Sequence, residues 1–505
     1  MQVMNQENIR LVKGQQVLNL LEDPAFIERL TILFEESVGT TVFQNPIFIK
    51  SWYQTKYSEY LPLIAIDEAG FNLNAVVFLA VKKEPNGTIK RHQAKIVGVG
   101  EYDAEYQTWL VKEGDDERFL TEAWSLILKD YPNCKIIFRF VPSFNSLSWI
   151  YKNSQWKKVS VIQEYHRPLL QMSHPKFKDV MKKRHLKAKY NRFRRAGKMD
   201  FEEINEINRF IEVYDEVMVL YDFRQGALFN KTPSESNPLR RSLFISLFRQ
   251  DLLHVSVLKL DDVITSCIIG MKSKLWMHLS GLITYSPFYS KHSPGLVHLF
   301  VLGKYLEEQG FEYFDLSPGG DGYKERMASN ADKVYELTIS QDPFFKTKID
   351  IRKKFHALLL SRGVRSMDFN LKVKRSKHFI KLKAKDFKNR IVGKKVKLLQ
   401  ESKKPMDLET NNIKHLLLYD DDLGTSRWDF LSNAFKKVEA GEKFISWADD
   451  NKLLFCLWFL ETIGNSPDNE TALVINEDYY SHPVVAAYKE EVLKTGTSIL
   501  HSLNR

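Results

Sequence analysis

A serine, a proline and a glycine stand together where a helix is expected to begin. Ser293, Pro294 and Gly295 follow a polar loop. Apolar or small residues then recur at three-and-four spacing, as on one helix face: Leu296, Leu299, Phe300, Leu302, Gly303, Tyr305 and Leu306. Such a start leaves the backbone N–H groups of Gly295, Leu296 and Val297 without partners inside the helix, and the helix dipole favours an anion there. The pattern predicts a phosphate site in which Ser293 caps, Pro294 suits the first turn and Gly295 permits close approach.

The surrounding residues supply the elements that would position this turn. Residues 276–283 are rich in β-favouring types, Gly310 stands where a helix C-cap glycine belongs, and residues 311–316 form a short apolar run. Strand, helix and strand in this order favour a parallel crossover unit. The alternative interpretation is an ordinary helix start, because many helices begin with Ser-Pro and bind no phosphate.

Four stretches in order resemble the signature of one known family. They are residues 41–46 (TVFQNP, leading into a helix with Trp52), 100–106 (GEYDAEY), 293–295 (SPG) and 314–326 (FDLSPGGDGYKER). Together they are similar to the CelD-like (cellulose-biosynthesis type) acyltransferases of the GNAT superfamily, over roughly residues 25–340. One departure is the turn at residues 317–320 (SPGG), where that family usually has an acidic or arginine-bearing turn.

The resemblance implies an α/β (α+β) fold with two tandem GNAT-like domains built on mixed sheets. We expect an N-terminal GNAT-like half at residues 1–174 and a C-terminal acyltransferase half at residues 175–345. Residues 346–404 would form a basic connector, and residues 405–505 a small α/β appendage of unknown role. No exact internal repeat is visible, so the two halves rest on element order and on the resemblance.

The resemblance also implies transfer of an acyl group, most simply acetyl, from acetyl-CoA or another acyl-CoA to an amine. Such chemistry needs a neutral amine, an oriented carbonyl and a proton donor for the leaving thiolate. The turn at residues 293–297 would hold the pyrophosphate of the co-substrate. Its expected binding residues are Ser293, Pro294, Gly295, Leu296 and Val297.

Five further residues receive roles on the same ground. Tyr323 is expected to give the thiolate its proton, because a phenol with a pKa near 10 can release a proton and recover it from solvent. Asp315 is the first candidate for the base or amine-positioning group, and His278 is the second. Lys324 and Arg326 are expected to pair with phosphate or with an acidic acceptor. The alternatives are a helix cap for Asp315, a buried imidazole for His278 and simple packing for Tyr323.

Length and composition limit the classes of protein to which the chain can belong. The chain has 505 residues, 44% of them hydrophobic, which suffices for two to four folded domains. It has no apolar run long enough for a secretory signal or a transmembrane span, so we expect a cytoplasmic protein. Cys134, Cys267 and Cys456 lie far apart without metal-ligand spacing. We therefore expect reduced thiols and no metal.

Positive charge predicts anionic partners. The net charge is +11, and the densest cluster of cations is a predicted helix at residues 175–198 with an apolar face formed by Leu186, Tyr190 and Phe193. Its cations either bind phosphates or form a solvated surface. Residues 350–404 are also basic but contain few aromatic residues, which favours a charged helical connector over a nucleic-acid-stacking surface. A weak contact with a membrane surface is a further alternative.

Other segments fit an α/β order. We expect a short β or irregular lead-in at residues 1–24, helices at 24–34, 46–57, 116–130, 204–221 and 239–249, a strand at 135–141, and hairpins at 61–82 and 252–271. The C-terminal region should contain a helix through Trp428, Leu431 and Phe435 and a hairpin at residues 443–459.

Three functions therefore compete. The first is N-acyl transfer from acyl-CoA to a small-molecule or peptide amine, in polysaccharide or envelope metabolism. The second is a Fem-like peptidyltransferase that uses aminoacyl-tRNA, which the basic segments would suit. The third is a non-catalytic GNAT-like scaffold or regulatory module.

Overall fold

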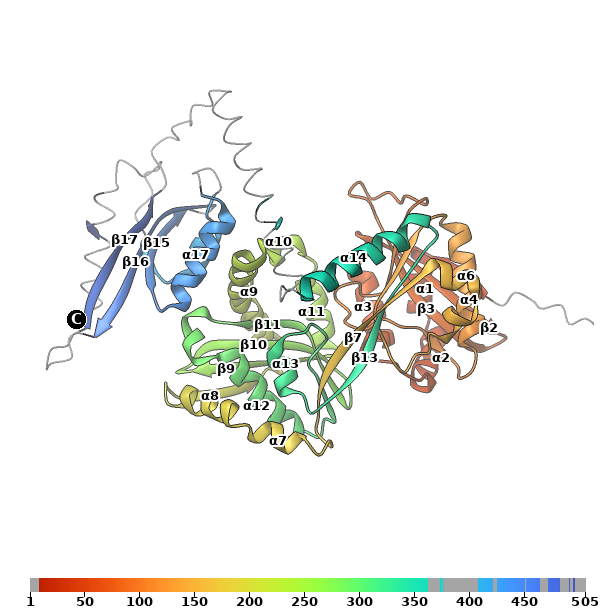
Figure 1. Ribbon diagram of the computed structural model, residues 1–505, viewed down its shortest axis with the longest axis horizontal. Coiled ribbons are helices and arrows are strands. Elements are labelled where there is room, and N and C mark those ends of the chain that lie inside the picture. The colour runs from red at the N-terminus through yellow and green to blue at the C-terminus, as the bar shows by residue number, and fades with distance from the viewer. Residues whose placement is uncertain are drawn as a thin grey trace, which may run out of the picture.

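Two β-sheets organise the protein (Figure 1). The computed structural model describes residues 9–361, 407–420, 425–449, 451–463 and 471–481, with single positions at 373, 374, 376, 490, 494 and 495. Strands from residues 9–340 form one large mixed sheet, and strands from residues 409–481 form a small antiparallel one. The predicted mixed α/β fold is confirmed. None of the helices in these ranges combines the length and apolar character that crossing a lipid bilayer requires.

The N-terminal half contains the predicted helices and hairpin. Asp23 and Asn45 cap two of its helices by accepting backbone N–H groups, and in both cases proline occupies the first turn. In chain order it comprises β1 (Ile9–Lys13), α1 (Gln15–Glu22), α2 (Pro24–Glu36), η1 (Val42–Gln44), α3 (Pro46–Lys56), β2 (Tyr60–Ala69), β3 (Asn72–Lys82), β4 (Lys95–Gly98), β5 (Leu110–Val111), α4 (Asp116–Asp130), β6 (Lys135–Pro142), α5 (Ser148–Lys152), α6 (Ser154–Val159) and β7 (Ser160–Gln171).

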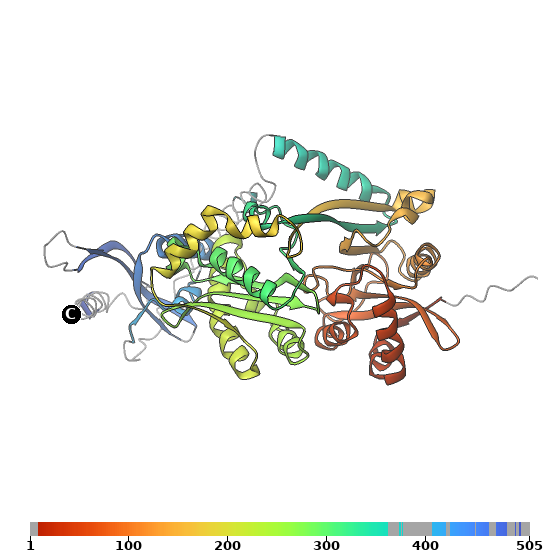
Figure 2. The same cartoon turned by 90° about the horizontal axis from the view of Figure 1, so that it is seen from below.

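The C-terminal half repeats this order of elements and adds a final helix. It comprises α7 (Phe177–Lys182), α8 (Arg184–Arg194), β8 (Met199–Glu203), α9 (Ile207–Phe229), α10 (Pro233–Ser236), α11 (Arg240–Arg249), β9 (Leu253–Leu260), β10 (Val263–Lys272), β11 (Trp276–Tyr285), η2 (Pro287–His292), α12 (Pro294–Glu308), β12 (Tyr313–Asp315), α13 (Gly322–Met327), β13 (Asn330–Ser340) and α14 (Pro343–Ser361). Figure 2 shows helices on both faces of its sheet, with α7 and α8 in yellow on one side and α9 and α11 in yellow-green on the other.

The large sheet joins the two halves through an exchange of strands. Its order is β1-β2-β3-β4-β6-β13-β7-β12-β11-β10-β9-β8, and β5 pairs with β3. Each half begins its sheet with an outer strand, followed by three α-helices and a hairpin. The next strand, β4 or β11, is then connected by one helix to a parallel neighbour: β4 pairs with β6, and β11 pairs with β12. β7 follows β6 in the chain but pairs with β12, whereas β13 follows β12 but pairs with β6. The long β7 and β13 also pair with each other, at the centre of Figure 1.

Strand alternation gives the sheet an apolar core on each face. In β2, Leu63 and Ala65 pack with the cluster that includes α4, whereas Ile64 and Ile66 pack with the cluster that includes α2 and α3. A strand that is covered on both faces reads as a continuous apolar run, as this one does. This rigid sheet fixes where the loops of the two halves meet.

Two sequence predictions were wrong in detail. The basic helix at residues 175–198 is divided into α7 and α8, because Lys183 adopts an extended conformation (φ −53°, ψ 126°). The break lets Val180 of α7 and Leu186 of α8 both pack in the apolar cluster that includes α12. The lead-in at residues 1–24 contains the strand β1, as one of the two expected forms, but it also contains the helix α1, which was not expected.

The C-terminal unit packs against α9. The Trp428 indole N–H donates to the Ala227 carbonyl at 3.1 Å, and the Phe223 and Phe435 rings lie 5.4 Å apart. A Cβ on Gly226 would lie 2.8 Å from Leu431 Cδ1, so glycine allows this close approach without a shift of the leucine. The predicted hairpin is confirmed, whereas most of the basic connector lies outside the described residues. The unit comprises β14 (Glu409–Thr410), α16 (Ile413–Leu417), α17 (Arg427–Glu439), β15 (Lys443–Asp449), β16 (Lys452–Ile463) and β17 (Thr471–Ser481).

Candidate functional site

Two parallel strands of the C-terminal half pair over a short stretch and then separate. β11 and β12 pair at three positions, the last of which is His278 with Asp315. β12 ends there, whereas β11 continues to Tyr285. Ser317 bridges the point of separation, because its hydroxyl donates to the Leu279 carbonyl at 2.8 Å. The separation leaves room beside β11 at the start of α12.

A cavity of about 600 Å³ occupies this room, and we call it the cradle cavity. It is lined by β11, by the start of α12 and by the turn after β12. Six of the residues predicted from the sequence line it: Ser293, Pro294, Gly295, Leu296, Tyr323 and Lys324. The N-terminal half contributes Glu105 and Arg139, so the cavity lies where the two halves meet.

The helix start at Ser293 differs from the prediction in its hydrogen bonds. Ser293 has left-handed backbone angles (φ 57°, ψ 48°) and makes no side-chain cap. Its carbonyl instead accepts the N–H groups of Leu296 and Val297, both at 3.1 Å. Within the described part of the chain, only the Gly295 N–H among the three predicted amides makes no hydrogen bond. The expected three-amide cradle was therefore wrong.

A lysine from α8 supplements this single amide. Lys189 Nζ donates to the Ser293 hydroxyl at 2.7 Å, and both residues line the cradle cavity. Burial and the nearby charges of Arg192 and Arg326 hold the pKa of Lys189 below its ordinary value. Neighbouring cations disfavour one another, so an added anion would relieve this repulsion. The turn thus presents one amide and one ammonium group to an anion.

Tyr323 and Lys324 lie in the same cavity, on α13. Burial, with the charge of Asp321 as a smaller cause, raises the pKa of Tyr323 to about 12, so its phenol is protonated at neutral pH. Lys324 is only 7% exposed; its ammonium donates to the Ser317 carbonyl at 3.3 Å and lies 3.6 Å from Asp321. Arg326 does not line the cavity: it is exposed, and its carbonyl accepts from Lys183.

Glu105 is the acidic residue that sequence reasoning missed. It lies in the loop between β4 and β5, and its carboxylate accepts from the Arg139 guanidinium at 3.3 Å. Burial raises the pKa of Glu105 to about 7, although Arg139 opposes the shift. A carboxyl group with this pKa at a cavity wall is suited to general base catalysis. The signal available in the sequence was its position inside the family-like stretch at residues 100–106.

Asp315 and His278 form a buried pair away from the cradle cavity. His278 Nδ1 donates to Asp315 Oδ2 at 2.9 Å, and the two side chains are 2% and 0% exposed. Burial alone would raise the pKa of Asp315, but the His278 hydrogen bond and the charge of Arg167 hold it below its ordinary value. Neither residue lines the cradle cavity, so the expected placement of Asp315 at the transfer site is corrected. Burial of Val297 likewise removes it from the cavity wall.

The C-terminal unit also reaches the cradle cavity. Glu439, at the end of α17, lines it and accepts from the Tyr285 hydroxyl and the Ser290 hydroxyl, both at 3.1 Å. Tyr285 ends β11 and Ser290 lies in η2, directly before the Ser293 turn. Glu439 therefore ties the small unit to the segment that leads into α12.

Comparison with known families fits this geometry. Residues 181–325 match the family model described as an acetyltransferase (GNAT) domain, and this range contains β11, the Ser293 turn, α12 and β12. The chain contains a GNAT-type acetyltransferase domain. Because the N-terminal half repeats the strand and helix order of that domain, the fold is a tandem GNAT-like arrangement with an added C-terminal unit.

Several solved structures resemble the chain at low identity. FemX is 10% identical with a TM-score of 0.43 and covers 64% of this chain and 98% of its own. A tandem GNAT protein from the clavulanic acid biosynthesis pathway is 10% identical with a TM-score of 0.40, covering 65% and 98%. L-PGS from Bacillus licheniformis is 13% identical with a TM-score of 0.39, covering 68% and 96%. No curated protein matches the sequence.

Metal-ligating side chains do not gather in the described ranges. No group of three or more His, Cys, Asp or Glu residues there could hold a metal ion.

Proposed function

We propose that the protein is an N-acyltransferase that takes an acyl group, most simply acetyl, from acyl-CoA and passes it to a primary amine. One observation carries the proposal: a single cavity joins the Gly295 turn of the C-terminal half to Glu105 of the N-terminal half, with Tyr323 in its wall. An anion-binding turn, a base and an acid are the three parts that such a transfer needs.

The residues fit the co-substrate at its anionic end. The unpaired Gly295 N–H and the Lys189 ammonium would hold the pyrophosphate, aided by the positive end of the α12 dipole. A Cβ on Gly295 would lie 3.6 Å from Tyr285, an ordinary contact, so there is space beside the turn. The acyl arm would then lie along β11, where β12 has ended.

The proposed proton transfers use Glu105 and Tyr323, whose pKa values are raised by burial. Glu105, with a pKa of about 7, takes a proton from the acceptor nitrogen. The nitrogen lone pair forms a C–N bond to the thioester carbonyl carbon, and the C–S bond breaks. Tyr323 gives its proton to the leaving thiolate and regains one from solvent. The products are an amide and the free CoA thiol, and Glu105 releases its proton to water.

The test measures both binding and thiol release with the full-length protein. Acetyl-CoA should raise the thermal unfolding midpoint, because a ligand that binds only the folded state stabilises it. Adding a panel of primary amines should then release free thiol, detected with a thiol reagent. If neither acetyl-CoA nor longer acyl-CoA esters shift the midpoint, the proposal fails and a scaffold role is favoured.

A second candidate donor is aminoacyl-tRNA, and the surface beside the cradle cavity favours it. Within the described ranges, nine exposed cations on and around α7 and α8 form no ion pair with an acid: Lys176, Lys178, Lys182, Arg184, Lys187, Arg192, Arg194, Arg195 and Lys198. Such a surface suits a polyanion, and Lys189 carries it into the cavity. A gel shift with tRNA that weakens steeply with salt, without stabilisation by acetyl-CoA, would favour this donor.

The finer assignment follows the sequence resemblance. We propose that the protein is a CelD-like acyltransferase that acts in the cytoplasm on a small-molecule or peptide amine of polysaccharide or envelope metabolism. Support comes from the Ser293 turn and Tyr323, which carry the resemblance and line one cavity. The thiols of Cys134 and Cys267 are free and buried, as a reducing compartment allows. Mass spectrometry of co-purified small molecules would identify the acceptor.

A further inference from the structure

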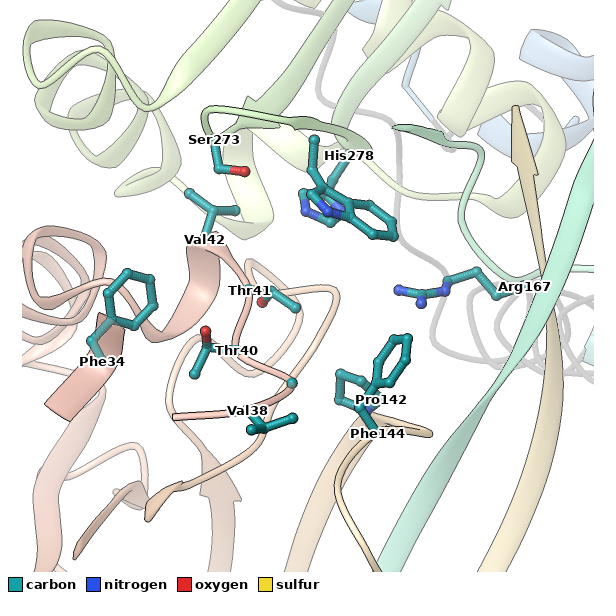
Figure 3. Close-up of a pocket in the computed structure, with 12 residues that line it drawn as sticks. Phe34, Val38, Thr40, Thr41, Val42, Pro142, Phe144, Arg167, Ser273 and His278 are labelled. Carbon is teal, nitrogen blue, oxygen red and sulfur yellow. The ribbon is translucent and has the colours of Figure 1, made fainter. Parts of the chain in front are cut away.

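A second cavity lies between the two halves and borders the His278–Asp315 pair (Figure 3). We call it the His278 cavity. Its volume is about 390 Å³, within the range of roughly 300–1,000 Å³ that is usual for small-molecule sites. It shares no lining residue with the cradle cavity, so it is a separate site.

Most of its wall is apolar and comes from both halves. Phe34, Val42 and Phe144 belong to the N-terminal half, and Trp276 belongs to β11. Figure 3 shows Phe34 and Val42 on one side of the opening and Phe144 on another. Phe144 is 65% exposed, so its ring is accessible to a ligand. The wall therefore suits the apolar body of a ligand.

The polar part of the wall contains the hydroxyl residues Thr40, Thr41 and Ser273 and two nearly buried side chains. Arg167 and His278 are each 2% exposed, and Figure 3 shows the Arg167 guanidinium directed into the cavity. Arg167 donates through Nε and Nη2 to Asp332, whereas its Nη1 lies 3.8 Å from Asp315 Oδ2, too far for a hydrogen bond. His278 donates through Nδ1 to Asp315.

One polar atom of Arg167 and one of His278 have no partner among the described residues and are free to bind a ligand. Neither Arg167 Nη1 nor His278 Nε2 has a hydrogen-bond partner in the part of the chain that the structure describes, and neither belongs to the polar atoms sealed from solvent. Both residues line the His278 cavity. In the tautomer whose Nδ1–H donates to Asp315, Nε2 of His278 is a hydrogen-bond acceptor, and Nη1 of Arg167 is a donor.

The charges around this pair of atoms select the ligand's head group. Arg167 carries one positive charge, whereas Asp315 and Asp332 carry two negative ones, so a further anion is disfavoured. An ammonium group could donate to Nε2 but would leave the Arg167 donor unpaired. A hydroxyl group can donate to Nε2 and accept from Nη1 at the same time. We propose that the His278 cavity binds a small neutral molecule with an apolar body and a hydroxyl group.

An adjoining hollow sets the shape of this ligand. A space of about 610 Å³ shares Phe34, Val42, Ser273 and Trp276 with the His278 cavity and continues to Lys272. The apolar body of the ligand can therefore be longer than one aromatic ring and extend toward Lys272. The ligand class is an elongated or aromatic alcohol.

The test compares three probes that differ only in their head group. Binding of 2-phenylethanol, phenylacetate and 2-phenylethylamine to the full-length wild-type protein is measured by ligand-observed NMR and calorimetry. We expect 2-phenylethanol to bind at least about five-fold more tightly than either charged probe, as one or two hydrogen bonds predict. Equal affinities for the three probes, or no binding of the alcohol, would overturn the proposal.

Two variants locate the binding site, so that the test does not depend on the folding of a single variant. Ser273→Trp places an indole in the cavity from a half-buried turn position and should abolish binding of 2-phenylethanol. His278→Phe removes the acceptor and should reduce the preference for the alcohol to less than about two-fold. Tyr323→Phe, in the other cavity, is the matched control and should bind 2-phenylethanol as the wild type does. If Ser273→Trp, folded as judged by circular dichroism, binds the alcohol normally, the site is elsewhere and the proposal is wrong.

Discussion

The Glu105 carboxylate lies 3.3 Å from the Arg139 guanidinium, and both line the cavity whose proposed anion-binding turn belongs to the other half of the protein. Neither half alone contains the turn, the base and the acid. The N-terminal half therefore supplies part of the proposed transfer site as well as a structural platform.

Glu105 should set the acidic limb of the pH profile. With a pKa of about 7, the carboxyl loses its proton as pH rises through neutrality, so kcat/KM should rise over the same interval. Glu105→Gln should remove this limb and lower kcat by about 100-fold. Arg139→Gln removes a positive charge that lowers the pKa of Glu105, so the limb should move to higher pH. A limb that stays in place in Arg139→Gln would remove Glu105 from the mechanism.

Gly295 should tolerate a methyl group but not a carboxylate. Gly295→Ala adds a Cβ at an ordinary 3.6 Å contact with Tyr285 and should keep the acetyl-CoA Kd within about two-fold. Gly295→Asp places an anion against the proposed pyrophosphate and should weaken binding at least about ten-fold. Calorimetric titration of both variants checks the pair. An unchanged Kd for the aspartate variant would refute the phosphate site.

Tyr323 should affect turnover more than binding. Tyr323→Phe removes the phenol proton and should lower kcat by roughly 10- to 100-fold while the acetyl-CoA Kd stays the same, because the lost interaction forms only as the thiolate leaves. Tyr221→Phe changes another tyrosine that lines the same cavity and is the matched control. Single-turnover kinetics with a primary amine measure the step, and equal rates for wild type and Tyr323→Phe would exclude the role.

Glu439 should position the cradle from the C-terminal unit. Glu439→Ala leaves the Tyr285 and Ser290 hydroxyls without their shared acceptor, so the segment before the Ser293 turn should loosen. We expect KM for acyl-CoA to rise about three- to ten-fold with kcat unchanged. Glu442→Ala, which alters an acid of the same unit that pairs with Lys437 at 3.7 Å, should leave KM as it is. A fall in kcat without a change in KM would contradict a positioning role.

Local signals predicted the elements of the fold well. Periodicity at residues 24–34 and 46–57 predicted α2 and α3, the pattern at residues 252–271 predicted the β9–β10 hairpin, and Gly310, with φ of 81°, follows the end of α12 as expected. The break at Lys183 had no such signal, because neither glycine nor proline marks it and the periodicity continues across it. It exists because both short helices pack in one cluster, which is a tertiary effect.

The site was predicted less completely than the fold. The Ser293 turn and Tyr323 were found because their neighbours in sequence are also their neighbours in the cavity. Glu105 was missed because its raised pKa depends on burial by residues far away in the chain. Asp315 was misplaced because its sequence position gives the end of a strand but not the direction of its side chain, which His278 and Arg167 determine.

The exchange of β7 and β13 limits how the protein can be divided. A fragment that holds only residues 181–325 would lack β7, which pairs with β12, and would lack Arg167, which faces Asp315. Such a fragment should expose the unpaired edge of β12 and unfold or aggregate. The exchange of β7 and β13 also restricts movement of the two halves away from each other. We therefore expect substrates to enter between the loops at the edge of the cavity and not through a wide hinge opening.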